Sequence, residues 1–120
     1  MPNKREFKKY VEAIGASVCD EMMIVYYNVE GVDQDKIRES IARVLGAVGA
    51  ATSRANVFFD KGVKAFPSVV EYSKGKREFF RALFRKISTD FSTEIDAALK
   101  EFNSAIPAEV KDRLRQEAAR

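Results

Sequence analysis

The chain has 120 residues, of which 46% are hydrophobic and 32% are charged, and its net charge is +3. This length and balance predict one folded domain over residues 1–120 and exclude a disordered or collagen-like chain. The sequence has no histidine and one cysteine, which excludes the common histidine-based catalytic sites, thiolate zinc cages and an intrachain disulfide.

The first predicted element is a helix over about residues 4–29. Asn3 lies three residues before Glu6, a spacing at which an N-cap side chain binds the first free amides of a helix. Apolar residues then recur every three or four positions, as on one face of a helix. They are Phe7, Val11, Ile14, Val18, Met22, Val25 and Val29. The run 22–29 is also apolar enough for a buried strand, so an α+β fold with strands at 22–29 and 56–60 is the alternative.

Two further helices are predicted before residue 67. Gly31 and Asp33 are typical of a helix end and of the N-cap that follows it, so a second helix is expected over 33–49. Its small residues predict that another backbone approaches closely. They are Ala42, Gly46, Gly49 and Ala50. Ser53 is a further cap candidate, and the apolar spacing up to Pro67 predicts a short third helix.

The second half of the chain carries one long apolar stripe. Ser68 and Glu71 have capping-box spacing and predict a helix start, and the stripe continues to Phe102. One helix or two fit this stripe, and the Ser, Thr and Asp at 88–90 favour a break or kink. Pro107 at a first-turn position starts the last helix. The expected architecture is all-α, an up-and-down bundle of about five helices.

Positive charge is concentrated between residues 53 and 88, which hold nine basic and three acidic residues. On a helix over 74–86, four basic residues fall within about 80° of one another, opposite the apolar side. They are Lys74, Arg77, Arg81 and Arg85. Such a face is solvated, paired internally with acids, or bound to an acidic protein or to nucleic-acid phosphates.

Three large apolar residues lie off the main stripes of their predicted helices. They are Met23, Tyr27 and Phe58. A monomer buries such side chains only where a helix is covered on two sides. Two arrangements provide this cover: a dimer with an apolar interface at these residues, or a first helix that is central to the bundle.

No catalytic, cofactor-binding or metal-binding motif is complete. Gly75 and Lys76 lack the earlier glycine and the following Ser or Thr of a phosphate-binding loop, and Glu109-x-x-Asp112 has no Glu-x-x-Glu partner for magnesium. We therefore expect a non-enzymatic protein without a cofactor that acts by protein–protein contact, including self-association as a homodimer. Sequence-nonspecific nucleic-acid binding through the helix face 74–86 is the alternative.

The sequence also predicts a cytoplasmic protein without membrane contact. The charged N-terminus is followed by no apolar signal region, and the longest charge-free stretch, 44–53, is half of the ~20 residues that span a bilayer. The lone Cys19 fits a reducing compartment. The segments REFKKYVE at 5–12 and VCDEMM at 18–23 are similar to parts of small uncharacterised bacterial proteins without an assigned function. This resemblance implies a bacterial, cytoplasmic protein and transfers no active site.

Overall fold

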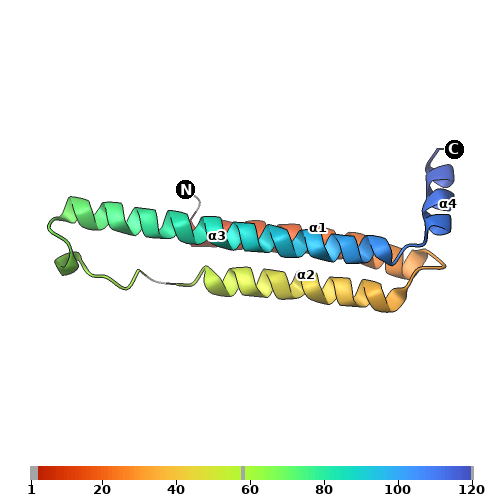
Figure 1. The fold of residues 1–120 in the computed structure, drawn as a ribbon, viewed down its shortest axis with the longest axis horizontal. Coiled ribbons are helices and arrows are strands. Elements are labelled where there is room, and N and C mark those ends of the chain that lie inside the picture. The colour runs from red at the N-terminus through yellow and green to blue at the C-terminus, as the bar shows by residue number, and fades with distance from the viewer. Residues whose placement is uncertain (1–2, 58, 120) are drawn as a thin grey trace.

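Three long helices lie side by side, and a short fourth helix turns away from them at one end (Figure 1). The structure is a computed structural model that describes residues 3–57 and 59–119. Its elements are α1 (Lys4–Asn28), α2 (Gln34–Arg54), the 3₁₀ turn η1 (Val63–Ala65), α3 (Val69–Ser104) and α4 (Ala108–Ala118). Within the described ranges the fold is all-α, as predicted, with four α-helices where about five were expected. Because the described ranges contain no strand, the α+β alternative is wrong.

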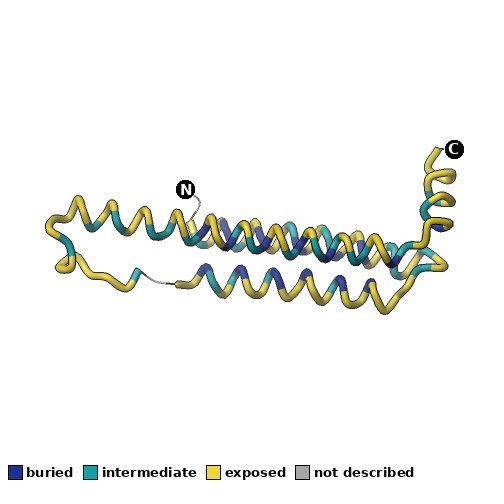
Figure 2. The backbone as a smooth tube through the Cα atoms, viewed as in Figure 1, coloured by how far each residue is buried: buried dark blue, intermediate teal, exposed yellow. Residues whose placement is uncertain are grey.

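The hydrophobic core lies where the three long helices face one another. Buried positions recur along each helix and follow the facing sides (Figure 2). On the helices they include Phe7, Val11, Cys19, Met22, Ile37, Val44, Ala47, Ala51, Phe84, Ile87, Phe91, Ile95 and Ala98. The rings of Phe7 and Phe84 lie 5.1 Å apart between centroids and join α1 to α3. The stripe predicted for the first helix therefore faces the core as far as Val25, and that of the long helix faces it from Phe80 onward.

Polar side chains cap the starts of the long helices as their spacing predicts. Asn3 Oδ1 accepts a hydrogen bond from the Glu6 amide at 2.8 Å, and Ser68 Oγ accepts one from the Glu71 amide at 3.1 Å. Asp33 caps α2 in the same way. Gly31, between α1 and α2, has a φ of 87°, in the left-handed region that favours glycine. These local signals fix where the helices begin and how α1 turns into α2.

The predicted helix between Ser53 and Pro67 is wrong. Ser53 lies inside α2, which continues to Arg54 because its alanine-rich end has high helix propensity. Of the residues described after α2, only Val63–Ala65 form a helical turn before α3. Gly62 and the β-branched and aromatic residues of this stretch have lower helix propensity than alanine, and the segment is too short to offset that deficit.

The predicted break at 88–90 is also wrong, since α3 is one helix from Val69 to Ser104. The Thr89 hydroxyl donates a hydrogen bond to the Arg85 carbonyl of its own helix at 2.9 Å. Thr93 donates to the Thr89 carbonyl at 3.0 Å in the same way. These hydroxyl groups therefore bond within the helix and do not end it.

The small residues of α2 do not receive another backbone, contrary to the prediction. Ala42 and Ala50 are exposed, and nothing lies within 4 Å of a Cβ built at Gly46 or Gly49. The close approach occurs instead at the contact between α1 and α2, where buried Gly15 of α1 faces Val48 of α2.

The molecule is a rod because its three long helices lie along one axis, and α3 is the longest of them (Figure 1). The extents of the rod are 66 × 27 × 19 Å. Nζ of Lys4, at the start of α1, lies 5.4 Å from the Phe80 ring centroid. Residues 69–79 of α3 therefore extend past the start of α1, and Figure 1 shows that they also extend past the end of α2. We call residues 69–79 the overhang. No helix within the described ranges is both long and apolar enough to span a bilayer.

Candidate functional site

The predicted basic face lies on the overhang and on the adjoining turns of α3. Lys74, Arg77, Arg81 and Arg85 are all exposed. None of these four side chains forms an ion pair or hydrogen bond among the residues that the structure describes. Internal pairing therefore does not neutralise this face, which is open to solvent and to anionic partners.

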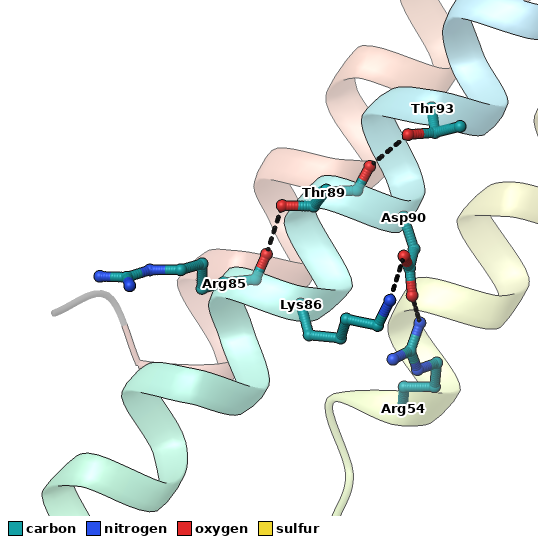
Figure 3. Close-up of polar contacts among 6 residues, drawn as sticks. All are labelled: Arg54, Arg85, Lys86, Thr89, Asp90 and Thr93. Carbon is teal, nitrogen blue, oxygen red and sulfur yellow. Dashed lines mark hydrogen bonds and ion pairs between the residues drawn. The ribbon is translucent and has the colours of Figure 1, made fainter.

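The nearest ion-pair group between helices lies just beyond the basic face, and none of the four basic-face residues takes part in it. Arg54 Nη1 donates to Asp90 Oδ2 at 2.7 Å, and Lys86 Nζ donates to Asp90 Oδ1 at 3.1 Å. Figure 3 shows Arg85 pointing away from this group. The hydrogen bond from Arg54 and then that from Lys86 lower the pKa of Asp90 below its ordinary value. Asp90 thus joins α2 to α3 and stays charged near neutral pH.

Other acids of α3 also pair with α2. Arg43 Nε lies 3.1 Å from Glu94 Oε2, and Arg43 Nη1 lies 3.8 Å from Glu101 Oε2. These acids lie toward the far end of α3 from the overhang. Asp90, Glu94 and Glu101 therefore pair with arginines of α2 and not with the basic face.

The predicted apolar interface residues on α1 are exposed. Met23 is 42% exposed and Tyr27 is 73% exposed, so α1 is not the centrally buried helix of the second interpretation. The third residue of that prediction, Phe58, lies outside the described residues. Two further large apolar side chains of α1 share this exposure: Tyr10 is 62% exposed and Ile24 is 60% exposed.

Exposed residues of α1 form a second periodic line, opposite the core stripe. They are Tyr10, Ala13, Ser17, Asp20, Ile24 and Tyr27, which we call the outer seam. Their steps of three, four, three, four and three residues are the a/d spacing of a coiled-coil face. The signal is present in the sequence, but the stronger core stripe obscures it, and the sequence prediction does not include Tyr10 and Ile24.

Aromatic rings attach the connecting segment to the overhang. The Phe59 ring lies 5.3 Å from that of Phe79 and 5.9 Å from that of Tyr72, between centroids. Phe66 lies 6.0 Å from Phe59, and its ring would contact a Cβ at Gly75. This cluster is half-buried, so it packs the segment onto α3.

A shallow apolar groove of about 180 Å³ lies between α1 and α3. Its lining residues include Phe7, Val11, Ile14, Phe91 and Ile95. Asp96 is the one carboxylate among the lining residues, and the Tyr10 phenol is the other titratable group there. The groove offers mainly apolar contact.

Cys19 has the properties of a core residue. Its side chain is 7% exposed. Burial, and then the neighbouring Asp20 charge, raise the pKa of the thiol, so it is protonated at neutral pH and is a poor nucleophile. Across the described ranges, no group of three or more Cys, Asp or Glu residues is arranged to hold a metal ion.

Comparison with known proteins identifies no relative from which a function could be inferred. No protein-family model, curated protein or solved structure matches the chain.

Proposed function

We propose that this protein is a non-enzymatic, cytoplasmic helical module that associates with a second copy of itself through the outward side of α1. The observation that supports this most is the exposure of four large apolar side chains on one side of a single helix. They are Tyr10, Met23, Ile24 and Tyr27. The free, buried thiol of Cys19 suits a reducing compartment.

The size of the exposed apolar surface fits a weak or moderate dimer. Side chains of this size have full accessible areas of roughly 200 Å², so at the observed exposures the four present roughly 500 Å². A monomer's largest apolar patch is about 300–600 Å² and is often functional. A standard interface buries about 800 Å² on each partner, an area that the small residues between the large ones help to supply.

The outer seam carries few charges. Between Tyr10 and Tyr27 its one charged residue is Asp20, near the middle of the seam, where a carboxylate needs a hydrogen-bond donor from the partner. Tyr10 and Tyr27 lie at the two ends of the seam, and tyrosine is enriched at interfaces because an apolar ring carries a polar tip.

Sedimentation velocity over a wide concentration range tests the proposal. We expect a reversible dimer in wild type, weakened about tenfold or more by Ile24→Lys. The matched control is Leu45→Lys, because Leu45 is 58% exposed on α2 but lies off α1. A wild-type chain that stays monomeric throughout would overturn the proposal, as would a dimer that Leu45→Lys dissolves and Ile24→Lys leaves intact.

The unpaired basic face supports a second candidate function, nonspecific nucleic-acid binding. Its four side chains are exposed and free of ion pairs within the described residues, and Lys74 and Arg77 lie on the overhang. Phosphate contacts of this kind need no base recognition and weaken steeply with salt.

Fluorescence anisotropy of labelled single- and double-stranded oligonucleotides, at low and physiological salt, tests this second function. Arg77→Ala with Arg81→Ala should reduce affinity and lower the salt slope by about one for each phosphate that the variant no longer neutralises. Lys36→Ala with Lys100→Ala removes the same charge from exposed positions off the basic face and should have a smaller effect. A flat titration, or equal decreases in affinity for both double variants, would contradict it.

A further inference from the structure

We infer that two copies pair through α1 in antiparallel orientation about a twofold axis midway between residues 18 and 19. This inference rests on the proposed self-association and specifies its geometry. The steps of the outer seam read the same in both directions. Each member therefore meets another member when the helix is turned end to end, and the interface is isologous, as a twofold dimer requires.

The antiparallel register places large side chains opposite small ones. Ala13 of one copy lies level with Ile24 of the other, so the larger side chain fills the space that the smaller leaves. Tyr10 lies level with Tyr27 of the other copy at each end of the seam. Beside the seam, Met23 lies next to Ala16 of the other copy, another large residue against a small one.

The polar centre of the seam is also complementary in this register. Ser17 lies level with Asp20 of the other copy, where the hydroxyl group can donate a hydrogen bond to the carboxylate. The two Asp20 residues are staggered by three positions, about 4.5 Å along the helix, with a Ser17 hydroxyl beside each carboxylate. The one charged residue of the seam thereby gains a donor.

A parallel pair lacks both features. It sets Asp20 opposite Asp20, which places like charges face to face without a donor. It also sets Ala13 opposite Ala13 and Ile24 opposite Ile24, so one level of the seam is underfilled and another is crowded. The distribution of size and charge along α1 therefore selects the antiparallel pair.

Site-directed disulfide cross-linking tests this register. In a Cys19→Ala background, Ala13→Cys and Ile24→Cys are prepared as separate chains, one carrying a size tag, and are oxidised alone and mixed. We expect a covalent dimer of the tagged with the untagged chain in the mixture, at least several-fold above either chain alone. In the antiparallel pair, like cysteines lie about 16 Å apart along the axis, 11 residues at about 1.5 Å each, which is too far for a disulfide.

The outcomes separate the register from the proposed function. Cross-linking of each variant with itself, without a preference for the mixture, indicates a parallel pair and overturns the inference. A reversible dimer in sedimentation that gives no mixed cross-link overturns the register and leaves self-association standing. If the Cys19→Ala background and the wild type both sediment as monomers at every concentration, the register and the proposed self-association are both overturned.

Discussion

Gly15 determines how closely α1 and α2 pack. A Cβ added to this residue would overlap with Cγ2 of Val48, whereas one added to Gly46 on the outside of α2 meets nothing within 4 Å. Both glycines lie inside helices, so each carries the same intrinsic penalty relative to alanine. The pair separates the effect of packing from that of helix propensity.

We expect Gly15→Ala and Gly46→Ala to change stability in opposite directions. Overpacking at Gly15 should lower the free energy of unfolding by about 1–3 kcal/mol, reduced by the propensity gain. Gly46→Ala should raise it by about 0.5–1 kcal/mol. Guanidinium titrations followed by circular dichroism measure both, and equal stabilisation by the two variants would show that α1 and α2 are not in tight contact at Gly15.

Asp90 makes the fold sensitive to acid. The hydrogen bonds from Arg54 and Lys86 lower its pKa in the folded chain, so the unfolded chain binds the proton more readily. Stability from this group is therefore fully present above about pH 4, the ordinary range of an Asp carboxyl, and is lost as the pH falls through the lower folded pKa.

Asp90→Asn should flatten the acid side of the stability profile. Its melting temperature should lie below that of wild type at pH 7, and the two should converge as the pH falls below about 4. Thermal melts from neutral to acidic pH measure this, and the difference at neutral pH should shrink in high salt because the exposed charges are screened. A constant gap between the two profiles at all pH values would assign the destabilisation to packing.

At the scale of the element, α3 has two zones with different support. Its later turns pack on both α1 and α2, whereas the overhang is covered by the connecting segment through Phe59 and Phe66. Amides in a helical end with few buried contacts open more readily than those of the core. The overhang should therefore open separately from the rest of α3.

Phe59→Ala should release the overhang without unfolding the three-helix body. Hydrogen exchange of residues 69–79 should quicken, while exchange around the buried Ile95 should keep its wild-type rate. The comparison variant Phe91→Ala, which removes a buried core ring, should cost about 3–5 kcal/mol and quicken exchange throughout. Uniform quickening in Phe59→Ala as well would mean that the overhang and the body unfold as one unit.

The sequence predicts well where a residue can cap a helix, but it predicts poorly whether that residue caps a helix or lies inside one. The caps at Asn3, Asp33 and Ser68 depend on short spacings, and each is found where predicted. At Ser53 and at Thr89, the same residue types occur inside helices, because propensity and back-bonding to a helix carbonyl outweigh the capping tendency. Whether a Ser or Thr caps a helix or lies inside it therefore depends on the neighbouring helical turns.

The candidate surfaces were predictable in part for the same reason. The basic face depends on one helix and its spacing, and its four side chains are exposed on one helix as that spacing predicts. Glu78 is the acid within the basic face, and among the described residues it forms no ion pair with the four basic side chains; Asp90 and Glu94 of α3 pair with Arg54 and Arg43 of α2. The exposure of Tyr10 and Ile24 follows from the packing of α2 and α3 on one side of α1, which single-helix periodicity does not specify.

At the scale of the whole molecule, the chain exposes more surface than a compact domain does. Its radius of gyration is 20.0 Å, against about 14 Å for a compact chain of this length. Its accessible surface is 8213 Å², against about 6,500 Å² for a globular protein of this mass. The rod shape and the overhang produce this excess, which leaves room for a dimer interface along α1.

The antiparallel pair makes a long particle whose length can be measured. Contact between Phe7 and Phe84 sets the register of α1 against α3, so the proposed axis lies level with about residue 95 of α3. The overhang begins about 26 residues earlier, or about 40 Å away, which places the two tips about 80 Å apart. A parallel pair sets both overhangs at one end and stays near the 66 Å length of one chain.

Small-angle X-ray scattering should therefore give a maximum dimension that grows with concentration from the single-chain value to about 80 Å or more. Ile24→Lys should hold it at the single-chain value, and Leu45→Lys should not. A dimer that forms without lengthening would contradict the antiparallel arrangement. The same geometry sets the two basic faces at opposite ends of the particle, so an anionic partner that binds one end leaves the other free to bind a second.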